Sequence, residues 1–198
     1  PEIYAQYGAF RRFFNMLSDE KPSVCVLGLG YIGLPTAAVI ARSGCAVLGV
    51  DVTAHVVDTV NSGKIHIEEV DLEGLVQGVV ARGTLRASLH IEPADVFVIA
   101  VPTPFGDNHV PDTSYVMEAA TNVAAALKAG DTIILESTSP VGTTEKMRDL
   151  IAKLRPDLKI PGLTHDVPDV AIAYCPERVL PGRILEELTN NDRCIGGI

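Results

Sequence analysis

The sequence has no excess of basic residues, no apolar run long enough to cross a membrane, and no cysteine pair with metal-type spacing. Its 198 residues carry a formal net charge of −9, from 16 Lys and Arg against 25 Asp and Glu. Without a basic block, nucleic acid is not expected as a partner, because phosphate binding would have to be local. Neither a membrane span nor a secretory signal segment is recognised, so we expect a cytoplasmic protein.

The cysteines and histidines are too scattered to indicate a metal site or a disulfide framework. Three of the four cysteines fall in predicted strands or at strand edges, so we expect reduced thiols that fill the core. The five histidines form no ligand cluster, and no metal is predicted. The four cysteines are Cys25, Cys45, Cys175 and Cys194.

What the sequence does contain is a short apolar strand that runs into a G-x-G-x-x-G turn. Residues 24–27 precede Gly28, Gly30 and Gly33, and a helix of small residues is expected over about 32–43. In a dinucleotide-binding turn, the first glycine makes the tight turn, the second lets a pyrophosphate approach, and the third lets helix and strand pack closely. The positive end of the helix would then face the anion.

A second predicted strand, residues 46–50, ends at Asp51, which lies 18 residues after Gly33. A carboxylate at this point could accept hydrogen bonds from both adenosine ribose hydroxyls and would repel a 2′-phosphate, which favours NAD over NADP. The alternative is an ordinary βαβ unit in which the acid caps the next helix. The dinucleotide site is favoured, because strand, glycines, helix and acid occur in the required order.

Strands and helices alternate along the rest of the chain. Almost continuously apolar segments at 96–101, 132–136 and 170–174 are typical of parallel strands that are covered on both faces. We therefore predict an α/β fold, a Rossmann-type doubly wound, mostly parallel sheet with helices on both faces. Further helices are expected at about 54–61, from an N-cap at Asp71 to 82, at 114–128 and at 143–153, with a short strand at 85–87.

The residues that follow the predicted strands are candidate site residues, because ligands bind beyond the carboxyl ends of the strands in such a sheet. Turn-forming, hydroxyl-bearing or charged residues occupy all of these strand exits. The exits are 28–33, Asp51, 102–104, 137–142 and 175–178.

Together, the exits resemble the NAD-binding domain of the UDP-glucose/GDP-mannose dehydrogenase family, over about residue 24 to the end. The motifs at 28–35, 101–104, 136–144 and 174–182 carry the resemblance. Within the family, the chain looks most like the branch that oxidises UDP-N-acetyl-mannosamine. The resemblance implies an NAD-dependent, four-electron oxidation of the C6 alcohol of a UDP-sugar to the uronate, in polysaccharide biosynthesis. UDP-glucose or GDP-mannose 6-dehydrogenation, and a non-catalytic NAD-binding module, remain alternatives.

The resemblance also implies catalytic roles. In this family a cysteine traps the aldehyde as a thiohemiacetal, a second hydride transfer leaves a thioester, and water releases the uronate. Thr138 would help to hold the water, and Glu177 would assist proton transfer and hydrolysis. The nucleophilic cysteine and a lysine are expected beyond residue 198, so Cys175 is expected to be structural. Alternatively, Thr138 and Glu177 cap helices or close turns.

Binding roles follow from the same resemblance. Arg178, Val179 and Leu180 would lie along the UDP-sugar substrate, although Arg178 could instead form a surface ion pair. The expected cofactor-binding residues are Gly28, Gly30, Tyr31, Ile32, Gly33, Asp51, Pro102, Thr103 and Thr138.

Two segments are expected in the chain. Residues 22–198 would form the NAD-binding domain. Residues 1–21 would form an extension whose aromatic and leucine residues repeat at helical spacing, which predicts an amphipathic helix packed on its own domain or on a neighbouring subunit. Because the chain stops directly after the strand-like segment 193–198, we expect a piece of a longer protein, lacking a central helix and a C-terminal domain. The longer protein would be a homodimer, and the piece alone would bind NAD with little or no turnover.

Overall fold

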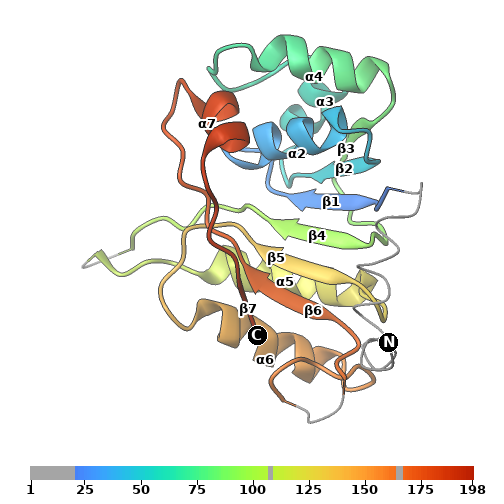
Figure 1. The fold of residues 1–198 in the computed structure, drawn as a ribbon, viewed down its shortest axis with the longest axis vertical. Coiled ribbons are helices and arrows are strands. Elements are labelled where there is room, and N and C mark those ends of the chain that lie inside the picture. The colour runs from blue at the N-terminus through green and yellow to red at the C-terminus, as the bar shows by residue number, and fades with distance from the viewer. Residues whose placement is uncertain (1–20, 107–108, 164–166) are drawn as a thin grey trace, which may run out of the picture.

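One mostly parallel sheet organises the molecule, as Figure 1 shows. The computed structural model describes residues 21–106, 109–163 and 167–198. The strand order within these residues is β3-β2-β1-β4-β5-β6-β7, with β7 antiparallel to β6 and the other neighbours parallel. This is the predicted doubly wound fold. The strands are β1 (Val24–Leu27), β2 (Val47–Val50), β3 (Leu85–Ser88), β4 (Val96–Ile99), β5 (Thr132–Leu135), β6 (Ala171–Tyr174) and β7 (Gly196–Gly197).

Helices cover both faces of the sheet because successive side chains of a strand point to opposite sides. In β1, Val24 and Val26 belong to the apolar cluster that contains the side chains of α2 and α4, whereas Cys25 and Leu27 belong to the cluster that contains those of α5 and α6. Both clusters are buried, which explains the continuous apolar strands. The helices are α2 (Gly33–Arg42), α3 (Ala54–Asn61), α4 (Leu72–Ala81), α5 (Ser114–Ala126), α6 (Thr143–Leu154) and α7 (Ile184–Asn190).

The cysteine prediction is confirmed for two residues and wrong for one. Cys25 and Cys175 are buried free thiols, and burial raises the pKa of the Cys25 thiol to about 12. Cys45 is half-buried, whereas Cys194 is exposed. Cys194 lies two residues before the two-residue edge strand β7, whose residues are both exposed, so its side chain has no core to enter.

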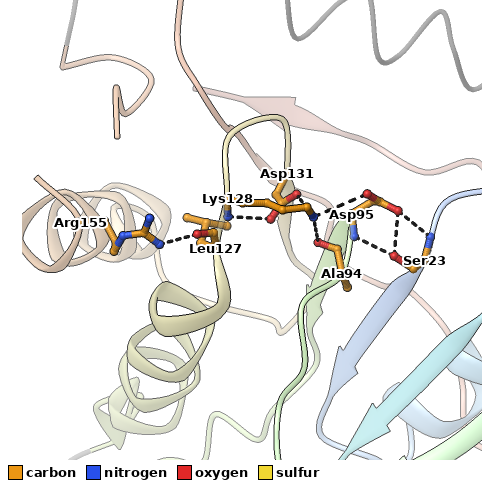
Figure 2. A network of polar contacts seen from close by, with 7 residues as sticks. All are labelled: Ser23, Ala94, Asp95, Leu127, Lys128, Asp131 and Arg155. Atoms are coloured by element: carbon orange, nitrogen blue, oxygen red, sulfur yellow. Dashed lines mark hydrogen bonds and ion pairs between the residues drawn. The ribbon is translucent and has the colours of Figure 1, made fainter. Parts of the chain in front are cut away.

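A polar network lies at the amino-terminal ends of the central strands (Figure 2). Ser23 and Asp95, which directly precede β1 and β4, are joined by bonds of 3.0 and 2.8 Å from the Ser23 amide and hydroxyl to Asp95 Oδ2. Lys128 Nζ lies 2.7 Å from Oδ1 of the buried Asp131, which precedes β5, and 3.7 Å from Asp95 Oδ1. Arg155, after α6, donates to the Leu127 carbonyl. The network therefore ties three strand starts to the α5–β5 turn.

Two local expectations differ from the structure. Helix α7 was not expected, because its seven residues are too few for a helical period to be recognised. Asp71 occupies the N-cap position of α4 but has a φ of 61° and makes no side-chain cap bond. The amphipathic helix was expected within residues 1–21, of which 1–20 are outside the described part of the chain. Among the described helices, none combines the length and apolar character needed to cross a bilayer.

Candidate functional site

A cavity of about 620 Å³ lies at the carboxyl ends of the central strands. Among its walls are residues from the exits of β1, β2, β4, β5 and β6, so residues far apart in the sequence meet at one edge of the sheet. Most of the predicted cofactor and catalytic residues are here. The predicted residues that line it are Gly28, Gly30, Tyr31, Ile32, Asp51, Pro102, Thr103, Thr138 and Glu177.

The three glycines of the turn have different surroundings. Gly28 has a φ of 89°, and a Cβ built on it would lie 2.6 Å from the Ala100 carbonyl oxygen. A Cβ on Gly33 would lie 1.7 Å from the Gly28 carbonyl oxygen, whereas a Cβ on Gly30 would meet no atom within 4 Å. Gly28 and Gly33 are therefore required by the turn and by helix packing. Gly30 leaves open the space through which a ligand could approach the backbone.

Helix α2 begins directly after this turn and has no side-chain cap. Its N-cap residue, Ile32, makes no capping bond, so its first N–H groups are not satisfied by a side chain. Uncapped amides at the positive end of a helix bind anions well. The turn, the open space at Gly30 and the uncapped helix start together fit a diphosphate.

Asp51 connects the glycine turn to the end of β2. Its Oδ2 accepts a hydrogen bond of 3.0 Å from the Leu29 amide, and its Oδ1 accepts one of 2.9 Å from the Thr53 amide. Thr53 is the N-cap residue of α3, so the carboxylate also orders the start of that helix. Asp51 lines the cavity as well, and the two alternatives weighed from the sequence are therefore compatible.

The exits of β4 and β5 are joined by side-chain hydroxyls. Thr103 Oγ1 donates to the Thr138 carbonyl oxygen at 2.7 Å, and Ser137 Oγ donates to the Val101 carbonyl oxygen at 2.7 Å. These bonds hold Thr103 and Thr138 side by side on the wall of the cavity.

The residues expected along the substrate lie elsewhere. Glu177 lines the cavity and accepts a 3.0 Å bond from the Val179 amide. Arg178 and Val179 line a separate hollow of about 10 Å³ beside α7, and Leu180 is exposed. Arg178 makes no ion pair within the described part of the chain, so nothing there supports the surface-pair alternative. The structure thus brings the cofactor residues together and leaves this triplet outside the cavity.

A buried glutamate fixes the segment that carries the triplet. Glu69, in the loop before α4, accepts 2.7 Å bonds from the Gly182 and Ile184 amides. These amides lie at the start of α7, so Glu69 supplies the cap that this short helix lacks in its own sequence. Val70, the next residue, is exposed.

Several cavity residues were missed from the sequence. His66 follows α3 in an irregular loop, and Glu136 ends an otherwise apolar strand segment. Glu136 begins the motif at 136–144, but neither residue was given a role from the sequence. Tyr115, Glu118 and Asn122 lie one or two turns apart on α5. A recognisable signal was available for α5, since two polar side chains interrupt an alanine-rich face at helical spacing.

Glu136 has an unusual electrostatic environment. The residue is 3% exposed, and burial raises the pKa of its carboxyl, while the hydrogen bond from Arg193 opposes that increase. Among the described residues, His66 Nδ1 is buried without a hydrogen-bond partner. Thr36 Oγ1 and Glu136 Oε2 are also buried and make no hydrogen bond of ordinary geometry, but the Thr36 hydroxyl faces the Glu136 carboxyl and lowers its pKa. His66 and Glu136 line the cavity, so unsatisfied polar atoms gather where a ligand would bind.

The family model for the NAD-binding domain of the UDP-glucose/GDP-mannose dehydrogenase family matches residues 22–198. The chain belongs to this family. It is 54% identical over 176 residues to a UDP-N-acetyl-D-mannosamine dehydrogenase from Escherichia coli strain K12, and equally identical to an NDP-N-acetyl-D-galactosaminuronic acid dehydrogenase from Ralstonia nicotianae. In both cases the match covers 89% of this chain and 42% of the relative, so the chain spans less than half of their length.

A solved structure of a named dehydrogenase also matches this chain. The UDP-N-acetyl-mannosamine dehydrogenase of Staphylococcus aureus has a TM-score of 0.79 and 43% sequence identity, over 88% of this chain and 41% of that one. The predicted family and its cofactor, NAD, are therefore confirmed. Among the described residues, no group of three or more His, Cys, Asp or Glu could hold a metal ion.

Proposed function

We propose that this chain is the cofactor-binding part of an NAD-dependent 6-dehydrogenase that converts UDP-N-acetyl-mannosamine to UDP-N-acetyl-mannosaminuronate. The observation that carries the proposal is the single cavity that contains the glycine turn, Asp51, Thr138 and Glu177. An acid positioned for the adenosine end and a hydroxyl with a second acid further along the same cavity suit a redox cofactor next to a proton-transfer site.

The residues of the chain divide into binding and chemical roles. The backbone at 30–33 would hold the diphosphate, and Asp51 would accept from the adenosine ribose hydroxyls. Thr103, bonded to the Thr138 carbonyl, would position the cofactor along the cavity wall. Bound NAD supplies the hydride acceptor for the alcohol carbon.

Thr138 and Glu177 would act on the substrate end. A hydroxyl can orient the attacking water, and a carboxylate held by a backbone amide can accept a proton from it. Arg178, Val179 and Leu180 would contact the sugar nucleotide in the complete protein. The thiol nucleophile is expected beyond residue 198, so the chain alone should bind NAD with little or no turnover.

The test is a panel of sugar nucleotides given to the complete protein that carries this domain. UDP-N-acetyl-mannosamine should be oxidised with two NAD reduced per sugar. Steady NADH production by the 198-residue chain alone would contradict the division of roles. Higher kcat/KM with UDP-glucose or GDP-mannose would contradict the substrate.

A second candidate comes from the Ralstonia relative, whose name refers to an N-acetyl-galactosaminuronic acid and whose identity to the chain is the same 54%. An N-acetylated galactosamine nucleotide therefore belongs in the panel. A non-catalytic NAD-binding module is the remaining alternative, and absence of a cysteine in a G-x-G-x-C-type motif downstream would support it. We further propose a cytoplasmic homodimer in polysaccharide biosynthesis.

A further inference from the structure

We propose that Arg193 is a positioning residue that fixes the separation of the two proposed catalytic residues, Thr138 and Glu177. The inference rests on the proposed function, which assigns those two residues their roles. Arg193 itself lies outside the cavity lining, so its action is through the backbone segments that carry them.

One nitrogen of the guanidinium joins two strand exits. Arg193 Nη2 donates to Glu136 Oε1 at 2.6 Å and to the Cys175 carbonyl oxygen at 3.2 Å. Glu136 stands two residues before Thr138, and Cys175 stands two residues before Glu177. Arg193 therefore bridges the exits of β5 and β6, and each bridged residue lies two positions before a proposed catalytic residue.

Few other contacts hold these exits together. The last backbone bond of the β5–β6 ladder runs from the Cys175 amide to the Leu135 carbonyl at 2.9 Å. Beyond it, the Ser139 amide donates to the Tyr174 hydroxyl at a longer 3.3 Å. Beyond the end of this ladder, the Arg193 bridge, with a short charge-assisted bond to Glu136 and a longer one to the Cys175 carbonyl, adds a link between the two exits.

The position of Arg193 depends on the final strand. β7 pairs antiparallel with β6, with Tyr174 opposite Gly196, and the Ile198 amide donates to the Ile172 carbonyl at 3.1 Å. This pairing runs the preceding residues back alongside the exit of β6, where Arg193 meets the buried carboxylate. The Glu136 side chain is 4% exposed and that of Arg193 is 28% exposed. If Arg193 were removed, water could not easily solvate the buried Glu136 charge in its place.

The experiment compares Arg193→Gln, Arg193→Lys and Glu136→Gln in the complete protein. Arg193→Gln should lower kcat by about tenfold or more while KM for NAD changes less than about threefold, because misplaced groups affect chemistry more than cofactor binding. Arg193→Lys keeps the positive charge but not the planar, rigid guanidinium, and Glu136→Gln keeps an acceptor, so both should fall between wild type and Arg193→Gln.

The matched control is Arg86→Gln. Arg86 makes a two-bond ion pair with Glu92, at 2.8 and 2.6 Å, on an exposed surface of β3 outside the cavity lining. The Arg86→Gln substitution also replaces a guanidinium by an amide, and it should leave kcat and KM at wild-type values. An unchanged kcat in Arg193→Gln, or parallel losses of kcat and NAD affinity with a lowered Tm, would overturn the proposal.

A second readout separates this inference from the proposed function. Hydrogen exchange should accelerate at the Ser139 and Cys175 amides in Arg193→Gln and stay unchanged in Arg86→Gln. If the wild-type protein oxidises no sugar nucleotide, the proposed function fails. Exchange at these amides still tests whether Arg193 holds the two strand exits together. Unchanged exchange at both would overturn it, whatever the activity.

Discussion

The amino and carboxyl ends of the central strands differ in how their polar side chains are satisfied. At the amino ends, Ser23, Asp95, Lys128 and Asp131 are partners of one another (Figure 2). At the carboxyl ends, His66 Nδ1 lines the cavity as a buried atom without a hydrogen-bond partner among the described residues, and Glu136 Oε2, although it faces the Thr36 hydroxyl, makes no bond of ordinary geometry. Because an unpartnered buried atom destabilises the fold, its retention indicates that the carboxyl ends are organised for a ligand rather than for stability.

The comparison predicts that substitutions at the amino ends change stability alone and that those at the carboxyl ends change mainly NAD binding. Gly33 is the expected exception, since it lies at the carboxyl ends but serves packing. Gly33→Ala should lower the free energy of unfolding by about 3 kcal/mol, because its Cβ would lie 1.7 Å from the Gly28 carbonyl oxygen. Denaturant unfolding followed by circular dichroism measures this.

The matched variant is Gly30→Ala, whose Cβ would meet no protein atom within 4 Å. Its unfolding free energy should stay within about 0.5 kcal/mol of wild type. NAD binding should weaken about tenfold or more, equivalent to ~1.4 kcal/mol, since the methyl group occupies the approach of the diphosphate. Equal effects of the two substitutions on stability would break the distinction between these glycines.

At the amino ends, Lys128→Met should destabilise the fold by about 2 kcal/mol, because the buried Asp131 carboxylate loses a charged partner at 2.7 Å. Its remaining bond, from the Lys128 amide, is kept. Calorimetric titration should give an NAD Kd equal to that of wild type. A weakened Kd would show that the two ends are not independent.

Asp51→Ala should weaken NAD binding about tenfold and reduce discrimination against NADP, because the carboxylate that accepts from the ribose and repels a 2′-phosphate is removed. Asp51→Asn separates charge from geometry, since one carbonyl oxygen remains to accept from the Leu29 or Thr53 amide. Titrations with both nucleotides measure the effect. Unchanged affinity and selectivity in both variants would remove Asp51 from the site.

The smallest expected effect concerns pH. Burial raises the pKa of the Glu136 carboxyl above its ordinary 4.5, so the folded state holds this proton more tightly than the unfolded state does. Its contribution to stability is therefore greatest below pH 4.5 and is lost as the pH rises through the folded pKa. The difference in unfolding free energy between wild type and Glu136→Gln should vary with pH in this direction. A pH-independent difference would contradict it.

The sequence predicted the sheet and most of the site because both follow from local patterns. Continuous apolar segments predict buried parallel strands, and the strand exits, known once the strands are known, contain Asp51, Thr103, Thr138 and Glu177. No spacing rule predicts Arg193 with Glu136, which are 57 residues apart, or Glu69 with Gly182, which are 113 apart. These pairs depend on the path of the chain around α7, whose first amide is capped by Glu69 from far away in the sequence.

A crystal structure of the chain with NAD tests the central claim most directly. The account predicts the diphosphate on the backbone amides between Gly30 and Gly33, with the adenosine ribose hydroxyls on the Asp51 carboxylate. A nucleotide bound at another edge of the sheet, or a turn that remains closed to the diphosphate at saturating NAD, would contradict it.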